Sequence, residues 1–323
     1  MAFTRRAALA ATATLASFAS ARAQTRWQAA CAYPDGNFHT RNLRSFLDEV
    51  AQAAGVQVQL HSNGALLPMP QIKRGVQTGQ VQIGEILVSA YGNEDPFFEI
   101  DSIPQLATST EQARKLRTLA KPYVEARFAR QGLTVLYEVP WPPSGLYTNL
   151  PVPTLETLRG SRMRTFNVMT NRFATLVGAT PTLVQAAEIP QAFATGVVNV
   201  MVTSAQTGVD SQAWDFCKTF TPIGFTRTMN TVFIQRRALE ALPAAQQAAI
   251  REAASRAEAR GWMAADEAGA AAQAMLGSRG MTIAPPSAEL LAGLATVGNT
   301  IAEEWVGRAG EDGRKALAAY RAG

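Results

Sequence analysis

The stretch from residue 155 to residue 204 decides the fold: LETLRGSRMRTFNVMTNRFATLVGATPTLVQAAEIPQAFATGVVNVMVTS. Its hydrophobic periodicity predicts strands near 162–166, 182–185 and 197–202, with helices near 170–177 and 188–194 between them. This β-α-β-α-β order favours a parallel sheet with a ligand cleft beyond the carboxyl ends of its strands. We expect Arg164 at one of these strand ends.

Three motifs follow one another in this stretch. They are Leu-x-Gly-x-x-Met-Arg at 158–164, Gly-Ala-Thr-Pro at 178–181 and Ala-Thr-Gly-Val-Val-Asn at 194–199. In this order they resemble the periplasmic solute receptors of TRAP transporters, of the DctP type. The resemblance implies an α/β, two-lobed periplasmic binding protein fold, in which each lobe is a mixed sheet flanked by helices and a long helix spans both lobes. It also implies that Arg164 forms a salt bridge to the carboxylate of a bound solute.

Composition allows two domains and argues against a polyanionic partner. The chain has 323 residues, 47% of them hydrophobic and 17% charged, so it can bury a large core. Of the formal charge of +5, three units come from Arg5, Arg6 and Arg22 in the N-terminal segment. Without that segment about +2 remains, and no Lys or Arg run resembles a nucleic-acid footprint.

The N-terminus has the three parts of an export signal. A basic start is followed by an Ala-, Thr- and Leu-rich stretch and by Ala21-Arg22-Ala23. We predict a signal peptide at 1–23 and a periplasmic location. The apolar stretch is too short to span a membrane, and the choice between the Sec and twin-arginine routes stays open.

The segment from Pro243 to about Leu276 lacks internal proline and is rich in Ala, Glu and Arg. Pro243 suits a first helical turn, and about 33 residues would give a helix of roughly 50 Å. The alternative is two helices broken at Gly261 or Gly269. In the resembled family a long helix runs along both lobes, so we expect lobe I at 24–141 and 230–269, and lobe II at 142–229 and 270–323.

Candidate contacts from lobe I begin with the loop after the first strand. Turn-forming residues follow Tyr33, and the predicted helix starts near Thr40. In the resembled family this loop lines the cleft, which makes Tyr33, Asn37 and His39 candidates, although turn chemistry would also explain them. Glu85 belongs to a predicted buried strand, so it either anchors a hydrogen-bond network or reads ligand hydroxyls.

The run from Trp141 to Asn149 is predicted to cross between lobes, because Pro142 and Pro143 cannot donate to a sheet ladder. Many members of the resembled family carry a second arginine here, where this chain has Ser144. Trp141 then favours a flat, apolar solute body, with hinge packing as the alternative.

Two polar residues complete the predicted site. Asn167 and Thr203 would form the polar shell around the carboxylate, next to Arg164. The resembled family tends to have an acidic or amide residue where this chain has Val202 and Thr203, which suggests altered recognition of the solute.

Motifs of several catalytic and metal-binding classes are absent from the sequence, including His-Glu-x-x-His, phosphate-binding loops and Cys-x-x-Cys. We therefore expect no metal or other cofactor and no catalytic residues. For the two cysteines, Cys31 and Cys217, buried free thiols are favoured over a disulfide.

The favoured hypothesis is a monomeric receptor that binds a small organic carboxylate between its lobes and delivers it to TRAP membrane subunits. The expected solute is an aromatic or apolar monocarboxylate or a 2-oxo acid, rather than an acidic sugar or a dicarboxylate. One alternative is a secreted hydrolase that uses Glu85 and His39. Another is the receptor of an ATP-driven importer.

Overall fold

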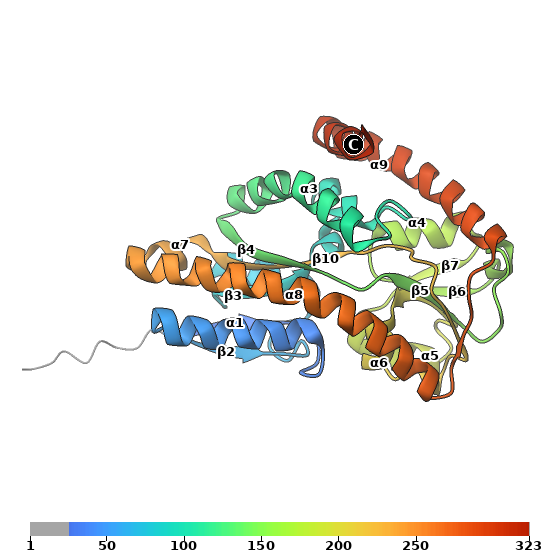
Figure 1. Cartoon of the computed structure of the whole chain (residues 1–323), viewed down its shortest axis with the longest axis horizontal. Coiled ribbons are helices and arrows are strands. Elements are labelled where there is room, and N and C mark those ends of the chain that lie inside the picture. The colour runs from blue at the N-terminus through green and yellow to red at the C-terminus, as the bar shows by residue number, and fades with distance from the viewer. Residues whose placement is uncertain (1–25, 323) are drawn as a thin grey trace, which may run out of the picture.

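The computed structural model describes residues 26–322. The predicted signal peptide at 1–23 lies outside the described residues. Two mixed β-sheets lie side by side with helices packed around them, the first sheet at the left of Figure 1 and the second at the right. This arrangement confirms the predicted α/β fold of two sheet-and-helix units.

The first sheet has five strands in the order β2-β1-β3-β10-β4. Strands β1, β2 and β3 run parallel, whereas β10 runs antiparallel to both β3 and β4. The strands are β1 Arg26–Ala30, β2 Gln57–His61, β3 Ile83–Leu87, β4 Leu133–Pro140 and β10 Met229–Gln235. The helices of this unit are α1 Phe38–Ala54, α2 Met69–Thr78, α3 Thr110–Arg130 and α7 Arg236–Glu240, with the 3-10 turns η1 Val88–Tyr91 and η2 Pro96–Ser102.

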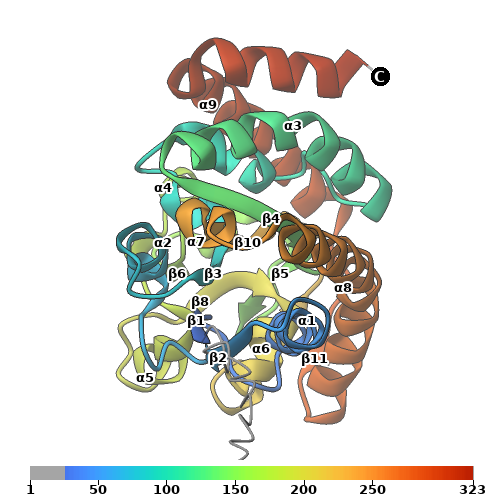
Figure 2. The ribbon, with the colours of Figure 1, turned by 90° about the vertical axis from the view of Figure 1, so that its left-hand side faces the viewer.

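Short sequence signals bound the helices of the first unit. Asn37 caps α1, because its side chain accepts a hydrogen bond from the His39 amide, and Gly55 ends the helix with φ of 66°. Gly79 ends α2 in the same left-handed conformation, at φ 81°. Figure 2 shows α1 to the right of the first sheet and α2 to its left, so the two helices cover opposite faces.

The second sheet has six strands in the order β11-β9-β5-β8-β6-β7. Strand β6 runs parallel to β7 and β8, which confirms the parallel arrangement predicted for 155–204. The strands are β5 Ser144–Thr148, β6 Arg162–Thr165, β7 Thr180–Leu183, β8 Val200–Ser204, β9 Thr219–Thr221 and β11 Thr282–Ile283. The helical elements here are α4 Val168–Leu176, α5 Ile189–Ala194 and α6 Ala205–Asp210, with η3 Leu155–Leu158, η4 Ala186–Glu188 and η5 Ala213–Asp215.

The prediction that the whole 141–149 run is a crossover was wrong. Only Trp141 to Pro143 crosses between the sheets, and β5 then pairs with both β8 and β9 inside the second sheet. The two prolines precede the strand, so every ladder donor of β5 remains available.

Two chain segments pass between the sheets side by side. The first joins β4 to β5, and the second joins β9 to β10. They bond to each other, since the Trp141 amide donates to the Thr228 carbonyl at 2.7 Å and the Ser144 amide to the Thr226 carbonyl at 3.0 Å.

Helix α8, Ala244–Ser278, is the predicted long helix and runs unbroken for 35 residues. It packs on α1 and β4 of the first unit and on α6 and β11 of the second (Figure 1). Gly261 does not interrupt it; a Cβ there would collide with Val139 of β4 and lie 2.8 Å from the Asn42 amide nitrogen. Glycine thus allows close packing at this point.

The last helix, α9, Ala288–Ala322, breaks at Gly310. It contacts α3 and η2 as well as α4 and η3, so it touches both units. The lobe boundaries at 141/142, 229/230 and 269/270 stay a prediction. Within residues 26–322, no helix combines the length and the apolar character that crossing a bilayer requires.

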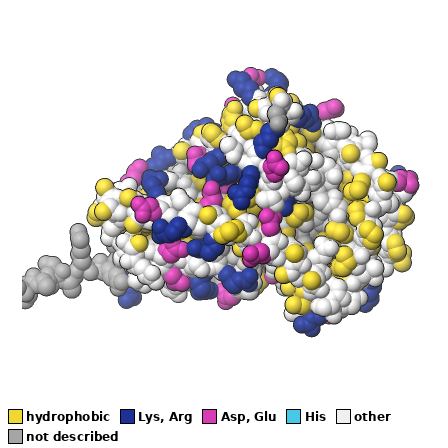
Figure 3. Space-filling view, viewed as in Figure 1, with side chains coloured by type: hydrophobic (Ala, Val, Ile, Leu, Met, Phe, Trp, Pro, Cys, Tyr) yellow, Lys and Arg dark blue, Asp and Glu magenta, His cyan; other side chains and the backbone are white. Residues whose placement is uncertain are grey.

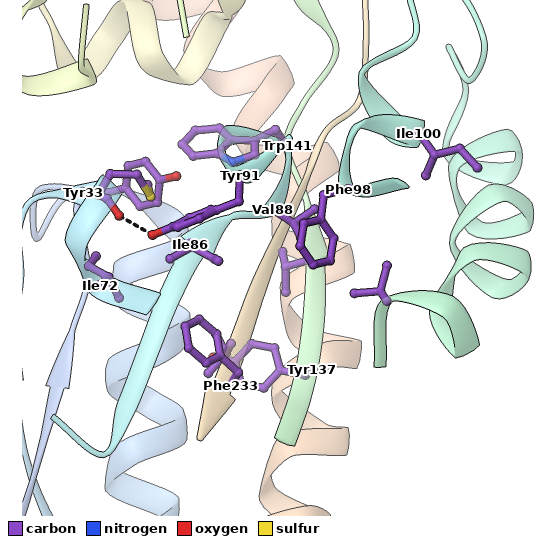
Figure 4. Close-up of a cluster of buried hydrophobic side chains, with 14 of the residues drawn as sticks. Tyr33, Ile72, Ile86, Val88, Tyr91, Phe98, Ile100, Tyr137, Trp141 and Phe233 are labelled. Atoms are coloured by element: carbon purple, nitrogen blue, oxygen red, sulfur yellow. Dashed lines mark hydrogen bonds between the residues drawn. The ribbon is translucent and has the colours of Figure 1, made fainter. Parts of the chain in front are cut away.

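The main buried core lies around the first sheet and continues toward the second. Aromatic rings meet edge to face in it, with 5.3 Å between the centroids of Phe46 and Tyr137 and 5.1 Å between those of Phe128 and Phe233. Figure 4 shows Tyr33 and Trp141 at the upper edge of this cluster. Cys31 and Cys217 are free, buried thiols, as predicted.

Candidate functional site

A cavity opens between the two sheets. It has an empty volume of about 530 Å³, part of it open to solvent, which is in the range of small-molecule sites. Of the described side chains that line it, Arg164 is the only charged one. The lining consists of Tyr33, Met69, Leu87, Ala90, Trp141, Ser144, Arg164, Phe166, Gln185, Ala186, Thr203, Ser204, Thr207 and Thr228.

Arg164 is a buried cation. It lies on β6 with only 3% of its surface exposed, its Nε donates to the Val184 carbonyl at 3.0 Å, and its guanidinium carbon lies 5.0 Å from the centre of the Phe166 ring. Among residues 26–322, no carboxylate pairs with it. Burial therefore lowers the pKa of Arg164 from 12.5 to about 10, against a smaller opposing influence of Tyr33. A carboxylate in the cavity would find an unpaired cation.

Tyr33 and Trp141 form an aromatic wall of the cavity. Their rings meet edge to face, with centroids 5.0 Å apart. The Tyr33 hydroxyl donates to Asn230 Oδ1 at 3.2 Å, and the Trp141 indole Nε1 donates to the same oxygen at 2.8 Å. Both donors are therefore engaged, and the wall offers ring surface to a ligand.

Hydroxyl side chains make up most of the remaining polar lining. Thr203 of β8 and Ser144 of β5 both line the cavity, and the two strands are hydrogen-bonded neighbours. Ser144 occupies the place where the resembled family often has its second arginine. The cavity thus has hydroxyls rather than a second cation at this position.

Two of the predicted contacts, Asn37 and Asn167, do not line the cavity. Each caps a helix, α1 or α4, and each also links the two units. The Asn37 amide nitrogen donates to Asp210 of α6 at 2.6 Å. The Asn167 amide nitrogen lies 3.0 Å from the Ser89 hydroxyl and 3.1 Å from that of Ser102.

Glu85 and His39 lie behind the aromatic wall. Both are 1% exposed, and their nearest approach to each other is 3.5 Å. Glu85 accepts from the Cys31 thiol at 3.1 Å and from the Asn230 amide at 3.2 Å. Burial, followed by the charge of Glu85, raises the pKa of Cys31. Since neither Glu85 nor His39 lines the cavity, the geometry does not support the hydrolase alternative.

Sequence reasoning missed several lining residues that follow strands of the second sheet. Phe166 comes directly after β6, Gln185 lies two residues after β7, and Ser204 ends β8. These positions meet at the carboxyl ends of parallel strands, where ligands bind in α/β sheets, so the strand-end rule was a usable signal. Met69, Leu87 and Ala90 gave no comparable signal, because apolar residues of this kind are as common in a core.

A family model described as bacterial extracellular solute-binding protein, family 7 (DctP), matches residues 31–306. The chain belongs to this family. Membership confirms that it is an extracytoplasmic solute receptor of the TRAP type, located in the periplasm, with the two-lobed fold and without an enzymatic role. It does not favour the ATP-driven importer as partner.

Solved structures of three similar receptors cover nearly the whole chain. The Bordetella pertussis receptor DctP7, which binds pyroglutamic acid, is 43% identical over 92% of this chain and 99% of its own, with a TM-score of 0.90. DctP6 of the same organism, also binding pyroglutamic acid, is 38% identical over 93% and 100%, with a TM-score of 0.91. A marine metagenome TRAP receptor specific for pyroglutamate is 32% identical over 93% and 99%, with a TM-score of 0.90.

Proposed function

We propose that this receptor binds pyroglutamate, the cyclic lactam of glutamic acid, and delivers it as a monomer to TRAP membrane subunits. The observation that carries the proposal is Arg164, a buried guanidinium in the cavity without a carboxylate partner among the described residues. Pyroglutamate has one carboxylate on a compact, uncharged ring. The three receptors of 32% to 43% identity that bind it support the choice of this acid.

Arg164 would capture the carboxylate through its two free Nη groups. The planar fork of a guanidinium matches the two oxygens of a carboxylate, and such charge-assisted bonds are stronger than neutral ones. Nε is already committed to the Val184 carbonyl, which holds the fork in place. Exclusion of water from the closed cavity would strengthen this pairing.

The remaining atoms of the ligand match the rest of the lining. A flat five-membered ring would lie against Trp141 and Tyr33, while the lactam N–H and C=O face hydroxyls. Ser144, Thr203 and Thr207 are the candidate partners, since a hydroxyl can both donate and accept. Pyroglutamate has the single carboxylate and the flat ring that the sequence predicts. It differs from the prediction in that its ring is a polar lactam rather than an apolar group.

The lining also favours a lactam over a free amino acid. The described cavity residues include no Asp or Glu, because Glu85 lies behind the aromatic wall. The ammonium group of proline or glutamate would be buried without a carboxylate to pair with, which is costly. Pyroglutamate avoids this cost because its nitrogen is an uncharged amide.

A thermal-shift and calorimetric screen tests the proposal. The mature protein is titrated with pyroglutamate, proline, glutamate, benzoate and glucuronate, and the screen is repeated with Arg164→Ala. A ligand at 100 times its dissociation constant adds about 2.7 kcal/mol of stability, so a specific solute is readily seen. We expect stabilisation by pyroglutamate alone, lost in the variant. Stabilisation by benzoate or glucuronate and not by pyroglutamate would refute the assignment.

A further inference from the structure

Asn230 is the shared anchor of the aromatic wall. It lies on β10, is 1% exposed and does not line the cavity. Its Oδ1 accepts from both the Trp141 indole and the Tyr33 hydroxyl, the polar ends of two rings that do line it. Figure 4 shows these two side chains close together above the core. One buried amide oxygen therefore holds the polar ends of both rings.

Glu85 decides which way the Asn230 amide points. Asn230 pairs with Leu87 across the β3–β10 ladder, so Glu85, two residues before Leu87, is its diagonal neighbour on the same face of the sheet. The distance from Asn230 Nδ2 to Glu85 Oε1 is 3.2 Å. A carboxylate accepts hydrogen bonds, so the NH2 group faces Glu85 and the oxygen faces the two aromatic donors. With the amide turned the other way, its NH2 group would face the Trp141 N–H and its oxygen would face the Glu85 carboxylate.

This chain of contacts has a consequence for the ligand. With both donors satisfied by Asn230, the wall presents ring surface without a free N–H or O–H. Glu85 is hydrogen-bonded to the wall through Asn230, and it also lies 3.5 Å from His39, whose ring packs on Trp141 with centroids 4.4 Å apart. Its carboxylate does not line the cavity. The polar side chains that line the cavity are then Arg164, Gln185 and the Ser and Thr hydroxyls.

We propose that Asn230 is a positioning residue for solute binding, and that Glu85 acts through it by fixing the amide orientation. The inference rests on the proposed function for its choice of ligand. Asn230 and Glu85 lie outside the cavity, and both would contribute to the affinity for a carboxylate on a flat, uncharged ring.

The test is a set of coupled substitutions in the full mature protein. Asn230→Leu keeps the approximate shape and removes the acceptor, so we expect pyroglutamate to bind at least about tenfold more weakly, as for a loss of one or two buried hydrogen bonds. Glu85→Met should weaken binding less, and should change it by less than about threefold in the Asn230→Leu background, because its effect passes through Asn230. Thr231→Val is the matched control. It removes a buried hydrogen bond to Glu138 from the adjacent residue of β10, and should leave binding within about threefold.

A second readout needs no ligand. The indole N–H signal of Trp141 in the NMR spectrum, assigned with Trp141→Phe, should move and exchange faster in Asn230→Leu, and should stay unchanged in Thr231→Val. A protein with Asn230→Leu that binds as the parent does, or keeps the indole signal, overturns the positioning role. If Asn230→Leu does not fold, Glu85→Met decides by the same two measurements.

The two proposals fail in different ways. If the parent protein does not bind pyroglutamate, the assigned function is wrong, and the indole signal still decides whether Asn230 holds the wall. If the parent binds and neither the affinity nor the signal follows the substitutions, the positioning role is wrong and the assigned function stands.

Discussion

Arg164→Met should have opposite effects on the empty receptor and on binding. Burial lowers the pKa of Arg164 from 12.5 to about 10, so the folded protein holds the cation at a cost. Each pKa unit corresponds to 1.36 kcal/mol, which makes this cost about 3 kcal/mol. At neutral pH the arginine is charged in the folded and the unfolded chain, so the cost applies to folding directly.

Methionine removes the charge and keeps an unbranched chain. The variant loses the Nε bond to the Val184 carbonyl, which is worth about 1 kcal/mol. We therefore expect a net gain of about 2 kcal/mol in the free energy of unfolding without ligand, or about 4 °C in Tm. Binding should weaken at least about 30-fold, since removal of one partner of a buried ion pair costs 2–5 kcal/mol.

The assay is denaturant unfolding of the ligand-free protein, with calorimetry for pyroglutamate. Arg162→Met is the control, because Arg162 lies on the same strand, is exposed and also donates through Nε to a carbonyl, that of Gly196. It should change stability by less than about 0.5 kcal/mol and leave binding intact. An Arg164→Met protein that unfolds more easily than the parent would refute the reasoning, because the guanidinium would then hold the fold together.

Three further predictions concern pH, the contact between the units and helix packing. Burial raises the pKa of Asp101 from 3.8 to about 7, so the folded state binds the proton more tightly than the unfolded state. The free energy of unfolding should therefore fall as the pH rises from about 4 to 7. Urea midpoints measured across this pH range should change less in Asp101→Asn. Asn37→Ser keeps a cap for helix α1, but the shorter side chain cannot reach Asp210. Calorimetry should show about tenfold weaker binding of pyroglutamate, with little change in Tm. An unchanged affinity would mean that the contact with Asp210 does not help closure. Gly261→Ala should destabilise by about 1–3 kcal/mol because its methyl group meets β4, whereas Gly277→Ala, with an ordinary contact at 3.5 Å, should be neutral or slightly stabilising in the same melts.

The sequence predicts the elements of this fold well where periodicity and caps agree. The β-α-β-α-β order of 155–204 and the long helix after Pro243 are both present, since neither depends on distant contacts. Strand β5 was missed because the adjacent prolines dominated the prediction, although they stop one residue short of the ladder. Its central position depends on pairing with β8 and β9, which lie much later in the chain.

The site was predictable only in part. Arg164 and Thr203 follow from their place near strand ends, and Trp141 from its place at the crossover. Asn230 gave no signal, because its role arises from the register between β3 and β10, which brings its amide to Glu85. Asn37 was a candidate because its loop lines the cleft in the resembled family, and Asn167 because it was expected beside Arg164. In the fold their amides already bond to other side chains.

The contacts that close the cleft suggest why a buried, unpaired cation suits a receptor. The links between the units from Asn37 and Asn167 are hydrogen bonds, each worth about 0.5–3 kcal/mol net, and the desolvated charge of Arg164 destabilises the folded receptor by an amount of the same order. A solute carboxylate forms an ion pair with that charge. The carboxylate therefore contributes most of its binding free energy in the closed form of the receptor. A ligand shifts an equilibrium only by its difference in affinity between the two states, and the unpaired arginine makes this difference large. On the face seen in Figure 3, charged side chains of both signs are intermixed. The pairing of the solute with the buried charge of Arg164 would make closure depend on the solute.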